Sequence, residues 1–131
     1  MRKDIDIPEV KNVYVAAVQE FNQDFNVTDW NAYIINDNAE PLETVIIVSQ
    51  GYDSEKMTAP MRKTIAQLPA KGYAKIEFLE ENVLKVNNFF TITYFLNGKL
   101  YDKRFELPAN SAIEDNEVAL PVMSKKGVLA R

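Results

Sequence analysis

Short apolar runs separated by polar links make up the first part of the chain. Residues 13–18 form a run with β-branched members, which predicts a strand buried on both faces, although its two alanines also allow a helix. Two further strand-like runs, 30–35 and 42–48, are separated by a link containing Asn, Asp and Pro. Because these residues favour turns, we expect the two runs to pair as a hairpin with a longer loop.

The pattern then changes to a helical one. Met61, Ile65 and Leu68 recur at spacings of four and three residues, as on one apolar stripe of a helix. Thr58 can cap the start of such a helix, and Pro69 stops its end. We therefore predict a short helix between these two residues.

A second hairpin gives the clearest local signal. Residues 88–96 and 99–107 alternate between apolar and polar and are joined by Asn97-Gly98, the dipeptide most favoured in a type I′ turn. The predicted register pairs Phe90 with Phe105, Ile92 with Lys103 and Tyr94 with Tyr101 on one face, and Phe95 with Leu100, Thr93 with Asp102 and Thr91 with Arg104 on the other. The first face is the better core candidate. Either the second face is also covered, or it presents an apolar patch to a partner.

The remaining segments complete a fold prediction. Residues 74–79 alternate and predict one more strand, whereas the tail after residue 107 has no clear period, and its basic end is expected to be solvated or to add an edge strand. The order of elements is three strands, one helix and three strands. We predict one domain, 1–131, of the α+β class: a single, mostly antiparallel sheet of about six strands with one short helix packed on a face. The alternative is a partly closed β-barrel with the helix across its opening.

Composition excludes several chemistries. The chain has no histidine and no cysteine, so Ser-His-Asp, Cys-His and histidine-zinc sites are ruled out. Its net charge of −4 argues against a general affinity for nucleic acid. The start of the chain carries two aspartates where a signal peptide needs apolar residues, and no apolar run is long enough to span a bilayer. We expect a soluble, cytoplasmic protein without cofactors and without membrane contact.

One motif invites a nucleotide-binding interpretation. The stretch VSQGYDSEKMTAPMRKT passes from an apolar run through Gly51 into the predicted helix. A P-loop needs a second glycine and a Lys-Ser/Thr pair, and neither follows Gly51 or Lys56. A weaker hypothesis is that Lys56, Arg62 and Lys63 attract a small anion to the helix start. The alternative is a capped helix with a solvated basic face.

Without histidine, acid–base or metal chemistry would have to use carboxylates. Candidate clusters are Asp4/Asp6/Glu9, Asp37/Glu40/Glu43, Glu80/Glu81 and Glu114/Asp115/Glu117. Residues 36–40 place oxygen ligands at alternate positions, as a calcium loop does, but Pro41 stands where such a loop needs glycine. Solvated loops and strand edges are the favoured explanation of these clusters, so a carboxylate-based enzyme is an alternative only.

The segments VSQGYDSEKMTAPMRKTIAQLPAKGYAKIE, NNFFTITYFLNGKLYDKRF and PVMSKKGVL resemble a small family of bacterial proteins of similar length with no established activity. Some members carry the label phenylalanyl-tRNA synthetase α subunit. This chain lacks the catalytic motifs of a class II synthetase, which needs a much larger antiparallel sheet and a glycine-rich motif ending in arginine, whereas four glycines are present here.

These observations favour a non-catalytic interaction or accessory module that contacts another protein or its own copy through a sheet face. The alternative is a small-anion or nucleotide-binding protein that uses the turn and helix start at 51–63.

Overall fold

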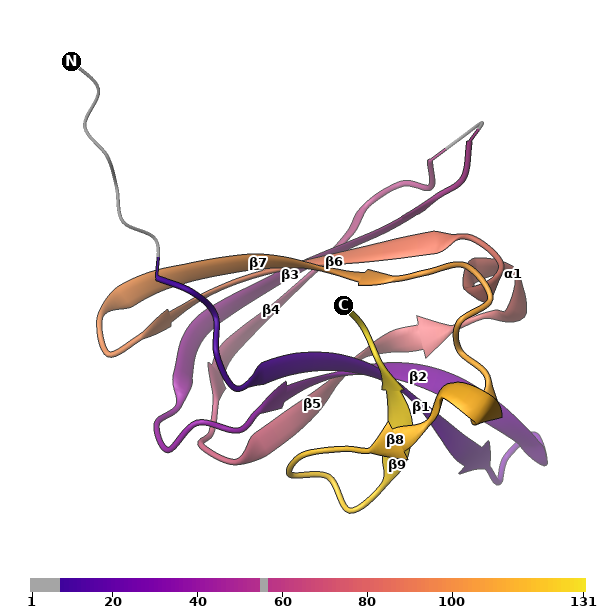
Figure 1. The fold of residues 1–131 in the computed structure, drawn as a ribbon, viewed down its shortest axis with the longest axis horizontal. Coiled ribbons are helices and arrows are strands. Elements are labelled where there is room, and N and C mark those ends of the chain that lie inside the picture. The colour runs from indigo at the N-terminus through magenta and orange to yellow at the C-terminus, as the bar shows by residue number, and fades with distance from the viewer. Residues whose placement is uncertain (1–7, 55–56) are drawn as a thin grey trace.

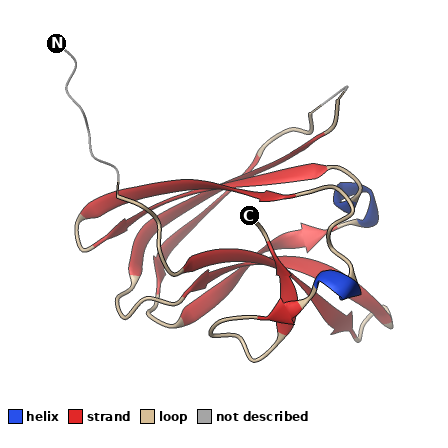
Figure 2. Cartoon of the chain, in the orientation of Figure 1, coloured by secondary structure: helices blue, strands red, loops and turns tan. Residues whose placement is uncertain are grey.

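Strands dominate the fold. A computed structural model describes residues 8–54 and 57–131. Its elements are β1 (Val13–Asn22), β2 (Val27–Asn36), β3 (Leu42–Tyr52), β4 (Met61–Leu68), β5 (Gly72–Leu79), α1 (Glu81–Leu84), β6 (Asn87–Leu96), β7 (Lys99–Leu107), the 3-10 turn η1 (Glu114–Asn116), β8 (Val118–Ala119) and β9 (Lys126–Leu129). Figure 2 shows how little of the described chain is helical.

The strands form two antiparallel sheets that lie one above the other (Figure 1). The five-stranded sheet has the order β5-β2-β1-β9-β8, and the four-stranded sheet has the order β4-β3-β6-β7. The prediction of mostly antiparallel strands is confirmed, and the described part of the chain has one short α-helix, α1, although it is not the segment predicted to be helical. The predicted single sheet of about six strands is inexact, because the strands divide between two layers, and no helix closes a barrel among the described residues.

The predicted hairpin of residues 30–35 with 42–48 is wrong, because these runs belong to different sheets. Each run has apolar residues on its inner face. These residues are buried in the core between the two sheets, so the two runs belong to opposite layers instead of pairing as neighbouring strands. The fully buried Asn36 stabilises the connection that leads from one sheet to the other. Its side-chain amide donates hydrogen bonds to the carbonyls of Glu40, at 3.0 Å, and Pro69, at 3.0 Å.

The predicted helix between Thr58 and Pro69 is also wrong, because this segment contains strand β4. Thr58 pairs with β3 instead of capping a helix. Its backbone N–H donates to the Gly51 carbonyl at 2.8 Å, and its hydroxyl accepts from the Gly51 N–H at 2.9 Å.

A phase break in β3 explains the helix-like spacing of β4. The buried Leu42 and Val45 are three residues apart instead of two, and Thr44 between them has a positive φ of 49°. The register of β3 on β6 shifts at the same place. Their partners on β4, Leu68 and Ile65, are therefore also three apart. That spacing occurs on one face of a helix as well, so the pattern alone did not separate the two structures.

The β6–β7 hairpin has the predicted register at every position. Asn97 and Gly98 have φ values of 52° and 77°, as both central residues of a type I′ turn require. The predicted core face is buried at Phe90, Ile92 and Tyr94.

Strand β1 is buried on both faces, as its continuous apolar run predicts. Its inner residues join the core between the sheets, and Ala16 and Val18 on its outer face pack against Leu120 and Met123. Strand β9 lies beside β1 and not at the edge, which corrects the expectation of an edge strand. Gly127 permits this close approach, because a Cβ there would lie 2.8 Å from the Ala17 carbonyl oxygen.

Candidate binding site at the open edge of β2

Strand β2 extends beyond the end of its neighbour β5. The last pair between the two strands is Trp30 with Leu79, whereas β2 stays paired with β1 as far as Val27. The chain leaves the sheet at Glu80 and enters α1. Residues 27–29 therefore have no strand neighbour on the β5 side within the described part of the chain.

The backbone of Thr28 faces this open edge. The Ala130 N–H donates to the Val15 carbonyl at 2.8 Å, so the backbone groups of Val15 point away from β2. Backbone direction alternates along a strand, and the pairing of β1 with β2 is continuous, so Phe21 also points away from β2. Its partner Thr28 consequently turns both its N–H and its C=O toward the position that a continued β5 would occupy.

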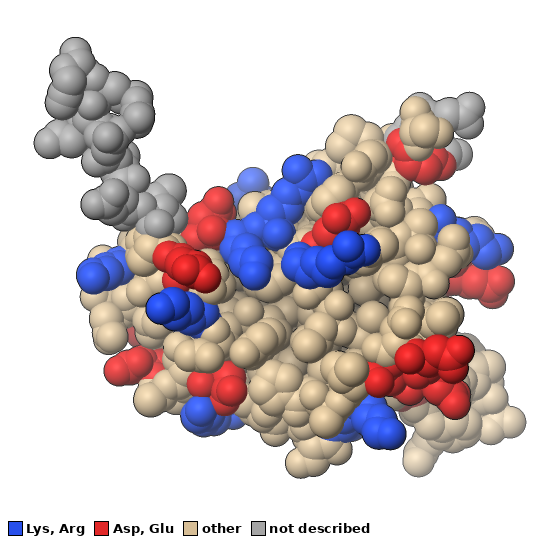
Figure 3. All heavy atoms as spheres, in the orientation of Figure 1, with Lys and Arg blue, Asp and Glu red and all other residues tan. Residues whose placement is uncertain are grey.

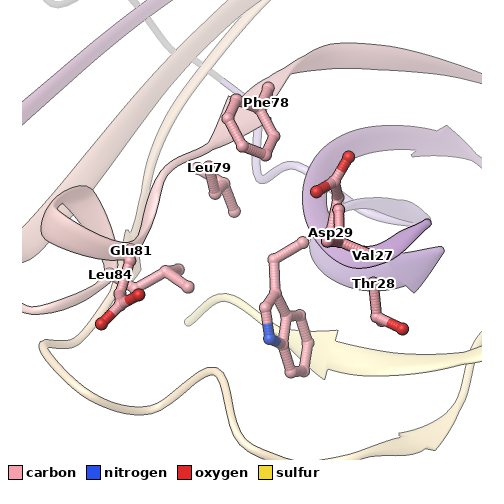
Figure 4. A pocket seen from close by; sticks show the side chains of 8 residues that line it. Val27, Thr28, Asp29, Phe78, Leu79, Glu81 and Leu84 are labelled. Carbon is pink, nitrogen blue, oxygen red and sulfur yellow. The ribbon is translucent and has the colours of Figure 1, made fainter. Parts of the chain in front are cut away.

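A pocket of about 430 Å³ occupies this position (Figure 4). Its lining consists of Val27, Thr28, Asp29, Trp30, Phe78, Leu79, Glu81 and Leu84. In the close-up, Glu81 and Leu84 approach from α1 on one side, and Val27 and Thr28 lie on β2 on the other. The pocket thus combines an open strand edge with aromatic and apolar walls. We call it the β2 slot.

A second hollow of about 430 Å³ lies on the outer face of the β1–β2 hairpin. Its lining consists of Glu20, Phe21, Asn22, Gln23, Asp24, Asp29, Asn31 and Lys75. Asp29 lines both this hollow and the β2 slot, so the two spaces adjoin at that residue. Three carboxylates against one lysine make the outer hollow acidic.

Glu20 is the best-connected side chain of the outer hollow. Its Oε1 accepts hydrogen bonds from Asn31, at 2.8 Å, and from the Tyr33 hydroxyl, at 2.7 Å, while Lys125 lies 2.6 Å from Oε2. Burial opposes the ionised form, but these three donors outweigh it, and the pKa of Glu20 lies below its ordinary value. Glu20 is therefore an ionised carboxylate with a cation already beside it.

Asn31 carries an unused acceptor in the same hollow. The residue is 6% exposed, and its Nδ2 donates to Glu20, but its Oδ1 has no hydrogen-bond partner among the described residues. Buried polar atoms are nearly always paired, so this oxygen is a place where a donor from outside would be stabilised.

The structure does not bring the residues predicted to bind an anion together into one site. Lys56 lies outside the described residues. Arg62 and Lys63 are neighbours on β4, paired with Val48 and Ile47, so their side chains leave opposite faces of the sheet. The helix start that motivated the hypothesis is replaced by a strand, and anion binding stays a prediction that rests on separate side chains.

Asp4 and Asp6 of the predicted carboxylate clusters lie outside the described residues, and the other members of the clusters are exposed or half-buried at the surface. Figure 3 shows acidic side chains gathered over the turn at η1, which carries Glu114 and Asp115. Glu81 reaches the β2 slot, but its side chain is 88% exposed and solvated. Across residues 8–54 and 57–131, no three His, Cys, Asp or Glu side chains are placed to hold a metal ion.

The outer face of the four-stranded sheet is the predicted apolar patch. Phe95 and Leu100 are 42% and 43% exposed there. Phe89 on the same face is covered by its neighbours, since the Tyr52 ring stacks on it at 5.0 Å and the Arg104 guanidinium lies 3.6 Å from its ring centre. Part of the aromatic surface on this face is therefore covered by side chains of the protein itself.

Comparison with known proteins gives no match: no protein-family model, no curated protein and no solved structure matches the chain. The resemblance to a small bacterial family, and with it any link to phenylalanyl-tRNA synthetase, stays a prediction. In the described ranges, no helix is long and apolar enough to cross a membrane.

Sequence reasoning missed Thr28, Asp29 and Trp30 as site residues. The sequence pattern of residues 22–29 predicts only a polar link. The open edge at these residues exists because β5 ends at Leu79, 50 positions later in the chain. The lone tryptophan beside an acidic residue was the only local signal.

Proposed function

We propose that this protein is a non-catalytic interaction module that binds an extended segment of another protein by adding it as a strand at the open edge of β2. The observation that carries the proposal is the outward-facing backbone of Thr28, next to a pocket of about 430 Å³ where β5 stops short. Strand addition uses main-chain hydrogen bonds for affinity and side-chain pockets for specificity, and the β2 slot offers both.

The β4 edge of the four-stranded sheet is protected against pairing. Strand β4 carries Arg62 and Lys63 and is bounded by Pro60 and Pro69. Charged side chains and prolines are the usual means of preventing edge-to-edge association. The edge at residues 27–29 has no proline, and the backbone of its one charged residue, Asp29, points toward β1, which favours Thr28 as the position for a partner strand.

The outer face of the four-stranded sheet was the predicted contact surface. Tyr52 and Arg104 already cover Phe89 on that face, and what remains exposed is mainly Phe95 and Leu100. The proposal therefore moves the contact from a sheet face to a sheet edge.

A peptide selection tests the proposal. Random peptides are selected on the immobilised protein and then measured against the Thr28→Pro variant. Proline removes the outward N–H, and because that N–H does not pair with β1, no internal hydrogen bond is lost. Selected peptides should bind the variant at least about tenfold more weakly, while the melting temperature of the variant stays within about 5 °C of the parent.

Two controls separate strand addition from other binding. N-methylation of the peptide backbone at the paired residue should weaken binding, because it removes the guest's own donor. Phe95→Ser, on the outer face of the four-stranded sheet, should leave binding unchanged. Peptides that bind Thr28→Pro and the parent equally, or that lose affinity only for Phe95→Ser, would contradict the proposal.

A further inference from the structure

The two hollows that meet at Asp29 define the chemistry of the guest strand. We infer that the β2 slot selects an extended segment in which a basic residue, opposite Asp29, stands next to an apolar residue, opposite Thr28. This inference rests on the proposed function and names the class of partner sequence that the site recognises.

Strand geometry assigns the two neighbouring guest residues to different hollows. Side chains of successive residues in a strand point to opposite faces, and directly opposed residues in paired strands share a face. Thr28 shares its face with Trp30, which packs against the core between the sheets, whereas Asp29 lies on the outer face with Asn31. A guest that continues the line of β5 therefore places one residue over the inner wall of the slot and the next beside Asp29.

The inner position fits an apolar side chain. Leu79 and Leu84 line the slot, and Leu79 is 2% exposed. Trp30 and Leu84 are half-buried there, so apolar surface is already present on the inner side, whereas Phe78, which pairs with Asn31, lies on the outer face. Burial of an aliphatic guest side chain against these groups removes apolar area from water on both partners.

The outer position fits a cation. Asp24 and Asp29 line the outer hollow, and Glu20, the cross-strand partner of Asp29, already holds the ammonium of Lys125 at 2.6 Å. Lys75 is the basic residue of the lining, so the carboxylates outnumber it. A guanidinium or ammonium group beside Asp29 would balance this charge.

Asn31 supplies an independent indication of a donor ligand. Its Oδ1 is an unpartnered acceptor in the described structure, while its Nδ2 is held by Glu20. Because Glu20 accepts that bond, the amide orientation that presents Oδ1 away from Glu20 is fixed. A cationic side chain has several N–H donors to offer such an acceptor, whereas a carboxylate or an apolar guest has none.

The same charge pattern argues against a second copy of this edge as the guest. A copy pairing antiparallel through Thr28 would bring a second Asp29, diagonally across on the same face, into an acidic hollow, and the like charges would repel each other. A basic partner segment meets no such repulsion.

A peptide series tests the inference. The probes are synthetic peptides of alternating Thr and Val in which one Thr is replaced by Arg, Gln or Glu and the adjacent Val by Leu. Their dissociation constants are measured by calorimetry for the parent protein, for Asp29→Asn, and for Asp115→Asn, which removes the same charge at η1 from a residue that lines neither hollow.

We expect the Arg peptide to bind about tenfold more tightly than the Gln peptide and the Glu peptide to bind most weakly, with the difference shrinking in high salt. Asp29→Asn should remove most of the preference for Arg, and Asp115→Asn should preserve it. Equal affinities for the three peptides, together with sensitivity to Thr28→Pro, would overturn this inference and leave strand addition standing. Binding that is insensitive to Thr28→Pro would overturn the proposed function as well.

Discussion

The Nζ atom of Lys125 lies 2.6 Å from Oε2 of Glu20, although the two residues are 105 positions apart in the chain. This contact fastens the segment that covers the outer face of the five-stranded sheet to strand β1. Asn31 and Tyr33 of β2 donate to the other carboxylate oxygen, so one ionised side chain joins three parts of the fold.

Glu20 should make the stability of the protein sensitive to acid. Burial opposes its ionisation, yet the hydrogen bonds from Lys125, Tyr33 and Asn31 lower its pKa below the ordinary value of 4.5. The ionised form therefore stabilises the native state above about pH 4.5, and this contribution is lost as the pH falls through the lower native pKa. Glu20→Gln should cost about 1–2 kcal/mol at neutral pH and flatten the decline below pH 4.5. Urea unfolding at a series of pH values measures both effects, and parallel pH profiles for variant and parent would refute the assignment.

Tyr94 should tolerate the loss of its hydroxyl. The side chain is 1% exposed and stacks on Tyr101 at 5.1 Å, but its hydroxyl has no partner among the described residues. Burial, with a smaller effect from Tyr101, raises its pKa far above the ordinary value of 10.0. We expect Tyr94→Phe to be neutral or to stabilise the protein by up to about 1 kcal/mol, because an unpaired buried polar atom is removed.

Tyr33→Phe is the matched control for that substitution. The Tyr33 hydroxyl donates to Glu20 at 2.7 Å, so its removal should cost about 1–2 kcal/mol in chemical denaturation. Equal losses for Tyr33→Phe and Tyr94→Phe would show that Tyr94 has a partner after all.

Ser49 and Glu77 should be energetically coupled across the two sheets. The Ser49 hydroxyl donates to the Glu77 carboxylate at 2.5 Å, from β3 to β5. A bulge in β5, opposite Ala32 and Tyr33, makes this contact possible. It interrupts the alternation of side chains between the buried Ile76 and Leu79, so that Glu77 can face β3. A double-mutant cycle with Ser49→Ala and Glu77→Ala should give a coupling of about 1 kcal/mol. Additive effects of the two substitutions would mean that the bond contributes nothing to stability.

Local patterns predicted the elements whose geometry is locally determined. The β6–β7 register followed from Asn97-Gly98 and strict alternation, and the two-sided burial of β1 followed from its unbroken apolar run. The β4 strand was mistaken for a helix because a positive-φ residue, Thr44, lies on the neighbouring strand and displaces the inward positions of β4. The hairpin prediction failed for a related reason, since turn residues at 37–41 are compatible with pairing and with a crossing between layers.

The candidate site was beyond the reach of local patterns. It exists because β2 is ten residues long and β5 ends opposite Trp30, and this mismatch arises from long-range register. Asp29 and Asn31 become neighbours of Glu20 only through the pairing of β1 with β2. The sequence did identify the protein as one without histidine or cysteine chemistry.

Amide hydrogen exchange at Thr28, followed residue by residue by NMR, tests the central claim most directly. In the free protein, the amide of Thr28 should exchange at least about tenfold faster than those of Val27 and Asp29, which point toward β1. Addition of a selected peptide should slow Thr28 and leave its two neighbours unchanged. A Thr28 amide that is as protected as its neighbours in the free protein, or that keeps its fast exchange when the peptide is bound, would contradict strand addition at this edge.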